Sequence, residues 1–272
     1  MAVQEEPGPP AARGRASQAA VSTGRIPLVL MYHSVTPYTA DPYLVTVSPQ
    51  RFEQQMRWLS RRGLRGVSMR ELLSARRAGG GRNLVGLTFD DGYADFASHA
   101  VPVLRRFGFT GTVFAIAGRL GEDNAWDVSG PRKPLMTAGQ LREVAAAGME
   151  IGSHGMNHVS LSDVADAAEL AEEIDHSREL LRELTGQEIP GFCYPYGHID
   201  ERAVARVRTA GYGYGCAIWR SVLTSRHALP RTYIGEADSW PRLRAKVLRH
   251  WLRWDYRGPG RYRVRLEPEL DG

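Results

Sequence analysis

The stretch "NLVGLTFDDGYAD", residues 83–95, places two adjacent carboxylates directly after an apolar run. The run 83–89 has the length and composition of a buried strand, and Asp90 and Asp91 follow at its carboxyl end. Like charges repel, and an acidic pair beside a buried strand lowers stability unless a cation or a reaction makes use of it. The stretch therefore predicts a strand that ends in a functional site.

The same alternation of apolar runs and helical periodicity continues along the chain from residue 25. Strands are expected at 26–33, 83–89, 110–118, 149–154, 191–197 and 212–218. Helices are expected at 48–63, 94–108, 137–148, 161–185, 200–211 and 239–258. Ser48 and Thr137 are the expected N-caps of two of these helices. Such alternation predicts an α/β fold with parallel pairing, and about seven βα units favour a barrel over an open sheet.

The composition is that of an ordinary globular protein. Of the 272 residues, 43% are hydrophobic and 24% are charged, and no apolar stretch approaches the roughly 18 to 20 residues that cross a bilayer. Residues 1–24 are rich in Pro, Ala and Gly and lack the apolar segment of a secretory signal, which predicts a disordered leader and a cytoplasmic location. We expect the barrel at 25–236, and a basic, Trp-rich helix and tail at 237–272.

The positive charge comes almost entirely from arginine. The chain has 33 Arg and only two Lys, Lys133 and Lys246, and its pI is about 9.4. Because the arginines are spread along the chain and interleaved with acids, we interpret them as a solvated surface and expect no nucleic-acid partner. Two cysteines, Cys193 and Cys216, indicate neither a disulfide framework nor a cysteine-based zinc site.

Polar side chains gather at the predicted carboxyl ends of the strands. His33 closes the first strand, Asp90 and Asp91 follow the second, and His154, His158 and Tyr196 follow later ones. In a parallel barrel these ends share one face, where loops build active sites. Residues more than 160 positions apart are therefore expected to meet.

The segment "SHGMNH", residues 153–158, has the spacing of a metal-binding pair. His154 and His158 are four residues apart, so that one turn can direct both imidazoles at one centre. Two histidines with one carboxylate and an open position are what a catalytic zinc-type site requires. No glycine-rich phosphate-binding pattern follows a strand, which argues against nucleotide chemistry.

Three motifs together carry a family resemblance. "TFDDGY" (88–93), "SHGMNH" (153–158) and "CYPYG" (193–197), in this order, resemble the polysaccharide deacetylases of the NodB-homology type, also called carbohydrate esterase family 4. The resemblance implies a distorted (β/α)7 barrel and a divalent metal, most commonly zinc. It also implies hydrolysis of an N-acyl group, acetyl being favoured, from an amino sugar or glycan.

The resemblance also assigns roles to individual residues. Asp90 is implied as the general base on metal-bound water, while Asp91 is implied as a metal ligand together with His154 and His158. A metal that lowers the pKa of its water, beside a carboxylate that removes the proton, makes chemical sense of the acidic pair. Tyr196 matches the position whose backbone N–H stabilises the oxyanion.

Two departures from the family pattern affect the site. Cys193 stands where the family usually has an arginine that orients the base, and no late Leu-x-His motif supplies the acid. "LVLMYHSV" (28–35) resembles the first motif of a permuted subgroup, similar to deacetylase domains of bacterial surface poly-N-acetylglucosamine systems, and this implies His33 as the acid. Arg231 is a candidate replacement for the arginine, although we favour a surface position for it, and Cys193 is interpreted as a small buried residue.

The segment 239–254 predicts an amphipathic helix. Its large apolar residues recur at helical spacing and define one face: Trp240, Leu243, Val247, Trp251 and Trp254. Packing of this face against the barrel is the favoured interpretation. The alternative is peripheral contact with a membrane surface that bears a lipid-linked substrate.

Three other functions are compatible with parts of this pattern. A non-haem iron oxygenase also uses two histidines and a carboxylate, but usually with a different spacing on a β-rich fold. A metal-free glycosidase would need Asp90 and Asp91 to flank a bond, which adjacent side chains rarely do. A catalytically impaired carbohydrate-binding NodB-like domain is the main alternative to the enzyme, because of the missing arginine.

Overall fold

The computed structural model describes residues 26–255, with side chains described to residue 252. The predicted leader at 1–24 and the predicted tail beyond residue 255 lie outside the described residues. Among those described, no helix is both long enough and apolar enough to cross a membrane.

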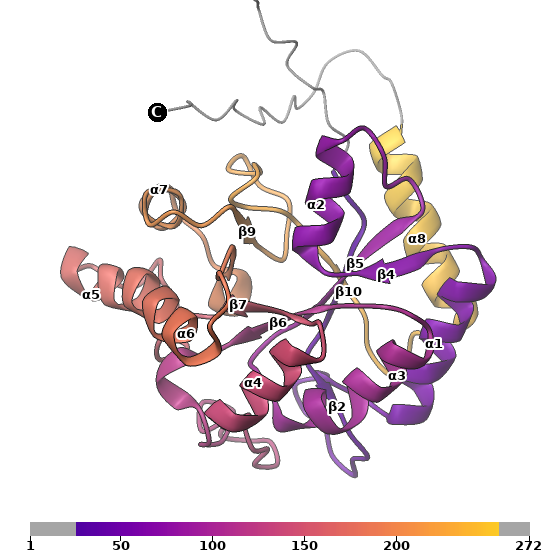
Figure 1. Ribbon diagram of the computed structural model, residues 1–272, viewed down its shortest axis with the longest axis horizontal. Helices are drawn as coiled ribbons and strands as arrows, with labels where there is room; N and C mark the ends of the chain where they lie inside the picture. Colours follow the sequence, from indigo (N-terminus) through magenta and orange to yellow (C-terminus); the bar gives the residue numbers. More distant parts are fainter. Residues whose placement is uncertain (1–25, 256–272) are drawn as a thin grey trace, which may run out of the picture.

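Parallel strands form the centre of the molecule, as the alternating pattern predicted (Figure 1). The sheet order is β10-β1-β5-β6-β7-β8-β9, and β4 pairs with one half of β5. The strands are β1 (Val29–Tyr32), β4 (Arg65–Val67), β5 (Leu84–Phe89), β6 (Thr112–Ala115), β7 (Glu150–Ser153), β8 (Gly191–Cys193), β9 (Tyr214–Cys216) and β10 (Thr232–Tyr233). Two short strands, β2 (Ser34–Val35) and β3 (Thr46–Val47), pair separately. The sheet curls into the expected distorted barrel, and one parallel bridge, Cys216 to Leu229, links β9 to the segment before β10.

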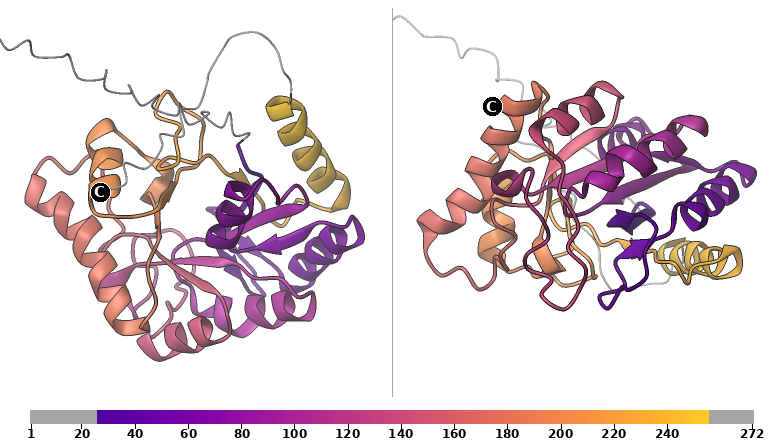
Figure 2. Two further views of the ribbon diagram at one scale, coloured as in Figure 1. Left: turned by 45° about the horizontal axis from the view of Figure 1, so that its top comes forward. Right: turned by 90° about the horizontal axis from the view of Figure 1, so that it is seen from below.

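Helices surround the strands on the outside of the curled sheet (Figure 2). They are α1 (Pro49–Arg61), α2 (Met69–Arg77), α3 (Val101–Arg106), α4 (Ala138–Ala146), α5 (Ala167–Ala171), α6 (Ser177–Thr185), α7 (Glu201–Thr209) and α8 (Trp240–Asp255). Shorter turns are η1 (Phe96–Ala100), η2 (Ala117–Arg119), η3 (Glu172–His176) and η4 (Pro195–Gly197). The helices cover the outer face of the strands and the interior of the curled sheet buries the inner face, so that the central strands read as continuous apolar runs.

Local sequence signals explain where several helices begin. The Ser48 hydroxyl caps α1 by accepting from the backbone N–H of Arg51, and Pro49 occupies the first turn. Thr137 and Gln140 form a reciprocal capping box at the start of α4. Both predicted N-caps are therefore confirmed.

The predicted helix at 161–185 begins six residues late and is not a regular α-helix. The Asp166 carboxylate caps the backbone N–H groups of Ala168 and Glu169, so that α5 begins at residue 167. The π-helical turn η3 then separates α5 from α6. A start at residue 167 is stable because the first N–H groups of a helix have no carbonyl partner within it, and the Asp166 side chain accepts two of them.

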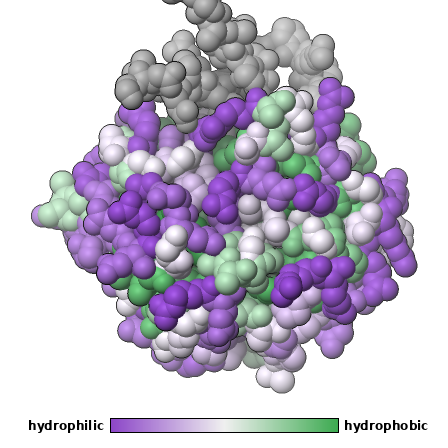
Figure 3. Space-filling model, in the orientation of Figure 1, coloured by the Kyte–Doolittle hydropathy of each residue, from purple (hydrophilic) through white to green (hydrophobic). Residues whose placement is uncertain are grey.

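An aromatic cluster fills the core between β1, β5 and the first helices. The rings of Tyr32, Phe52, Phe89 and Phe96 have centroids 4.6 to 5.7 Å apart and are all buried. Burial of rings of this size contributes on the order of 2 to 3 kcal/mol each. The two strands that carry Asp90 and His33 are thus held rigidly side by side. Outside the core, hydrophilic residues cover much of the face drawn in Figure 3, with hydrophobic ones scattered among them.

The predicted apolar face of the last helix is only partly packed. Leu243 and Val247 are buried and α8 lies beside α1 (Figure 1), whereas Trp240 and Trp251 are 60% and 42% exposed. The side chain of Trp254 lies outside the described residues. The favoured prediction, that this whole face packs against the barrel, is therefore wrong for Trp240 and Trp251.

Candidate active site

The acidic pair lies on a tight turn directly after β5. The backbone N–H of Asp90 continues the pairing with β1 by donating to the Tyr32 carbonyl at 2.9 Å. Asp91 and Gly92 then both adopt φ of 69°, a left-handed conformation that non-glycine residues rarely take. A Cβ at Gly92 would lie 3.1 Å from Ala115 Cα, so that the turn passes close to β6. The two carboxylates are thereby directed at different partners.

Asp91, His154 and His158 converge as the sequence predicted. Asp91 Oδ1 lies 3.3 Å from His154 Nε2 and 3.4 Å from His158 Nε2, and all three residues are buried. Burial alone would raise the pKa of Asp91, but its contacts with the two histidines outweigh burial and hold this pKa well below the ordinary value. Burial also lowers the pKa of His158, which favours the neutral imidazole that binds metals. One carboxylate and two imidazole nitrogens within 4.8 Å of one another fit a divalent cation such as zinc.

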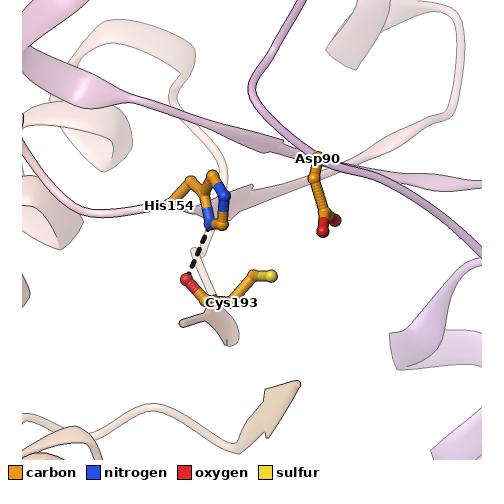
Figure 4. Close-up of side chains that lie close together, drawn as sticks. All are labelled: Asp90, His154 and Cys193. Carbon is orange, nitrogen blue, oxygen red and sulfur yellow. Dashed lines mark hydrogen bonds between the residues drawn. The ribbon is translucent and has the colours of Figure 1, made fainter. Parts of the chain in front are cut away.

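The two histidine rings are held in different ways. His154 Nδ1 lies 2.7 Å from the Cys193 carbonyl oxygen (Figure 4), which leaves Nε2 with its lone pair facing Asp91. His158 lies against two aromatic rings, with centroid distances of 4.4 Å to Trp126 and 4.6 Å to Tyr196. Trp126 comes from a loop that the sequence reasoning did not include in the site, because nothing in "NAWDVSG" indicates that it folds over a strand end.

Arg231 holds Asp90 from across the barrel. Its two terminal nitrogens lie 2.6 and 2.8 Å from the two Asp90 oxygens, and its Nε–H donates to the Ala217 carbonyl. Burial alone would raise the pKa of Asp90, but the guanidinium outweighs it and lowers that pKa. The favoured surface position for Arg231 is therefore wrong, since its side chain is fully buried beside the acidic pair.

Cys193, where the motif resemblance implied an arginine, lies beside the Arg231 guanidinium. An Arg231 nitrogen is 3.1 Å from the Cys193 sulfur. Figure 4 shows the Cys193 thiol beside Asp90 and His154, and these three form a second possible set of metal ligands. Burial raises the pKa of this thiol well above its ordinary value, and Arg231 already occupies both Asp90 oxygens, so this set is the poorer cation site. Cys193 is the small buried residue that the sequence predicted.

His33 follows β1, the strand that lies between β10 and β5 in the sheet, and it therefore lies beside Asp90. His33 Nε2 is 3.9 Å from an Asp90 oxygen, and the imidazole is 15% exposed. The residue after it is anchored, because Ser34 Oγ and the backbone N–H of Val35 donate to the two oxygens of Asp95. His33 is therefore in reach of the same reaction centre as Asp90.

Tyr196 reaches the same face through η4, directly after β8. It has φ of 58°, and its side chain is 44% exposed while one ring face lies on His158. All six predicted site residues thus lie on the face formed by the carboxyl ends of the strands.

Two loops form a wall beside the site that the sequence did not predict. The Tyr43 hydroxyl accepts a hydrogen bond from the backbone N–H of Ser129, and the Lys133 ammonium donates to the Thr46 hydroxyl. Lys133 is buried, and burial lowers its pKa. These contacts fasten the loop that carries Trp126 to residues 43–46, which lead into β3, although the two segments are more than 80 residues apart.

Comparison with known families supplies the identification. The family described as polysaccharide deacetylase matches residues 77–215, just over half of the chain. The chain belongs to the polysaccharide deacetylase family. The match covers the acidic pair, both histidines and Tyr196, and it agrees with the NodB-type resemblance of the motifs. Membership of the permuted subgroup remains a prediction.

Two curated bacterial relatives of this deacetylase-family chain are similar over about 70% of its length. It is 29% identical over 189 residues to the Bacillus subtilis protein named "Putative polysaccharide deacetylase YxkH", covering 69% of this chain and 62% of that protein. It is 23% identical over 203 residues to the poly-beta-1,6-N-acetyl-D-glucosamine N-deacetylase of Staphylococcus aureus, covering 70% and 68%. The chain thus spans less than two thirds of the Bacillus subtilis relative.

Solved structures share the fold. IcaB from Ammonifex degensii has a TM-score of 0.68 and 27% sequence identity, with 82% of this chain and 97% of that one covered. The Streptococcus pyogenes deacetylase PplD has a TM-score of 0.69 and 24% identity, with 82% and 98% covered. The distorted barrel of the deacetylase family is therefore the fold of this chain.

Proposed function

We propose that this protein is a metal-dependent hydrolase that removes an N-acyl group, acetyl in the first instance, from an amino sugar within a glycan. The observation that carries the proposal is that the two adjacent carboxylates, Asp90 and Asp91, have different partners. Asp91 faces two imidazole nitrogens, whereas the adjacent Asp90 is held by Arg231 and faces His33. A cation site and an acid–base pair therefore lie side by side.

The cation site is made of Asp91, His154 and His158, and zinc is the metal we propose. When bound there, the ion would act as a Lewis acid on the acyl carbonyl and favour deprotonation of the attacking water. Three protein ligands leave room for a substrate oxygen, as a catalytic site requires.

Asp90 and His33 are proposed as the base and the acid. Arg231 keeps Asp90 ionised, so that the carboxylate accepts a proton from the water that attacks the acyl carbon. His33 donates a proton to the leaving amine, and the backbone N–H of Tyr196 is proposed to stabilise the oxyanion. The buried guanidinium also supports activity over the catalytically impaired alternative, because that alternative rested on the missing arginine.

The sugar is proposed from the relatives. The Staphylococcus aureus relative is named for poly-beta-1,6-N-acetyl-D-glucosamine, and we propose an N-acetylated glycan of this kind as the substrate. Zinc-loaded protein is incubated with β-1,6- and β-1,4-linked N-acetylglucosamine oligomers and with an N-formylated analogue, and the products are analysed by mass spectrometry. Loss of acetyl groups from an oligomer is expected. Unchanged masses with every sugar would refute the proposed activity.

The ligand set is tested by metal content. His154→Ala and His158→Ala are expected to lose bound zinc after dialysis, because each removes one of three ligands. His99→Ala is the matched control, since His99 lies against the Val35 carbonyl, away from the ligands. Zinc content equal to wild type in either ligand variant would contradict the assignment.

Peripheral membrane contact through residues 239–254 is the proposed role of α8. Four of its large apolar side chains are exposed, namely Trp240, Leu248, Trp251 and Leu252, and Arg242, Arg244 and Arg249 are exposed along the same helix. An exposed apolar strip beside arginines suits the surface of an anionic bilayer. A cytoplasmic location remains a prediction from the sequence.

Liposome co-sedimentation tests this contact. The full chain is expected to pellet with phosphatidylglycerol vesicles more than with phosphatidylcholine vesicles, and the double variant Trp251→Ser, Leu252→Ser is expected to remain in the supernatant. Val222→Ser, at an even more exposed apolar residue outside α8, is the control. Equal pelleting of the wild type and the double variant would refute the contact.

A further inference from the structure

The loop between the two histidines rests on a single buried carboxylate. Glu173 Oε2 accepts the backbone N–H groups of Met156 and Asn157 at 2.8 and 3.1 Å, and Glu173 Oε1 accepts the Asn157 side-chain amide at 2.7 Å. All three donors belong to the four residues that follow His154. Glu173 itself comes from η3, about 15 residues further along the chain and on the helical side of the barrel.

Burial of the Glu173 carboxylate costs free energy unless hydrogen bonds replace its hydration. Glu173 is only 2% exposed, and a carboxylate removed from water must recover its lost hydration through hydrogen bonds. These hydrogen bonds come from the loop between His154 and His158, since three of its N–H donors converge on the two Glu173 oxygens. The fit leaves no space, because a Cβ at Gly155 would lie 2.8 Å from Glu173 Oε2.

The helix is locally distorted where Glu173 projects inward. Residues 172–176 form a π-helical turn between α5 and α6, and both Glu173 and Ile174 are buried. A π turn inserts an extra residue into a helix and is found often at functional sites. The insertion shifts the helix face at this point and allows a charged residue to face the barrel beside an apolar neighbour.

His158 needs support of this kind. It adopts φ of 62°, a conformation that persists in a non-glycine residue only when its surroundings impose it. Its buried Nδ1 has no hydrogen-bond partner among the described residues, whereas His154 has the Cys193 carbonyl. The orientation of His158 therefore depends on its backbone and on the rings beside it.

We propose that Glu173 is a positioning residue for the metal centre. By fixing the backbone of residues 155–157, its carboxylate holds His158 in the strained conformation that directs Nε2 toward Asp91 and alongside His154. The hydrogen bonds of Glu173 go to Met156 and Asn157 and to none of the three proposed ligands, so that it acts through the loop. This inference rests on the proposed cation site and adds the residue that assembles it.

Zinc affinity of the purified full chain tests the proposal, measured by competition with a chromophoric chelator. Glu173→Ala is expected to weaken zinc binding by about 10- to 100-fold, as loss of an outer support of a ligand commonly does. Glu173→Gln keeps an acceptor oxygen for the two backbone N–H groups and is expected to stay within about fivefold of wild type. Glu172→Ala, at the exposed neighbour on the same turn, is the matched control and is expected to change affinity by less than about twofold.

The absorption spectrum of the cobalt-substituted protein gives a second readout that does not depend on activity. A changed spectrum in Glu173→Ala with an unchanged one in Glu172→Ala would support altered ligand geometry. Should Glu173→Ala fail to fold, Asn157→Ala decides, since it removes one of the three hydrogen bonds at an exposed residue and is expected to weaken zinc binding by about fivefold.

A folded Glu173→Ala protein that binds zinc as tightly as wild type would overturn the role of Glu173 and leave the proposed function standing. If only Asn157→Ala folds, a zinc affinity of this variant equal to that of the wild type would likewise overturn the role of Glu173. A wild-type protein that binds no zinc would overturn the cation site and this inference together.

Discussion

Replacement of Arg231 by methionine perturbs the base without touching the proposed metal ligands. Arg231 contacts both oxygens of Asp90 at 2.6 and 2.8 Å, and the two side chains are 0% and 4% exposed. Methionine fills much of the same volume but leaves the carboxylate without its cation. Removal of one partner of a buried ion pair typically costs about 3 to 5 kcal/mol, so the variant should lose a comparable part of its stability near neutral pH.

The pH dependence of this loss follows from the pKa of Asp90. In the wild type the folded pKa lies below the unfolded one, so the ionised carboxylate contributes stability above the unfolded pKa, and this is lost as pH falls through the folded pKa. Without Arg231, burial dominates and raises the pKa of Asp90. As the pH falls, Asp90 of the variant becomes protonated, and the free-energy cost of its buried charge disappears. The difference in free energy of unfolding between wild type and variant should therefore shrink between pH 8 and pH 5.

Two assays measure these effects. Urea unfolding at pH 8 and pH 5 gives the stability difference, and kcat/KM against pH on an N-acetylglucosamine oligomer gives the ionisation of the base. The acidic limb of the kcat/KM profile of Arg231→Met is expected to move to higher pH by at least about one unit. At pH values below this limb, kcat/KM should therefore be roughly tenfold lower than in the wild type. Zinc content should stay at the wild-type level.

Arg57→Met is the control for these assays, because Arg57 pairs with Glu53 on the exposed side of α1 and such pairs contribute about 0 to 1 kcal/mol. An Arg231→Met protein with an unshifted acidic limb and wild-type stability would refute the reasoning that Arg231 sets the ionisation of Asp90.

Two further predictions concern the acid and the fold. His33→Gln should lower kcat on N-acetyl sugars by about 100-fold or more but spare the hydrolysis of 4-nitrophenyl acetate, whose leaving group needs no proton; equal losses on both substrates would contradict the role of His33 as the acid. Thr137→Ala removes the capping box of α4 and should lower the free energy of unfolding by about 1 kcal/mol with activity retained, as measured by urea unfolding, and a stability equal to wild type would show that the cap contributes nothing.

Much of the fold was predictable because local signals and burial agree. The acidic turn after β5 and the capped starts of α1 and α4 lie where hydrophobic periodicity and capping residues predict them. The strand β4 was missed because three residues show too few alternations to be recognised, and the helix α2 was missed although Ser68 caps it.

The site was predictable where its residues stand at strand ends, and less so elsewhere. Asp91 and His154 closely follow β5 and β7, so that parallel pairing brings them to one face, whereas His158 lies on the loop beyond β7 that Glu173 supports. Arg231 precedes the short edge strand β10, and its approach to Asp90 depends on a barrel closure that no local pattern records. Glu173 and Trp126 reach the site through a π turn and a long loop, whose geometry depends on tertiary contacts.

The central claim is that Asp91 and the two histidines hold a cation on which Asp90 depends for deacetylation. Its most direct test is a titration of metal-free protein with zinc, in which acetate released from a β-1,6-linked N-acetylglucosamine oligomer is measured for wild type and Asp90→Asn. We predict that wild-type release rises to a plateau at one zinc per chain, while Asp90→Asn binds zinc equally and releases no acetate above background. Wild-type protein that releases no acetate at any zinc occupancy, or Asp90→Asn protein as active as wild type, would contradict the claim.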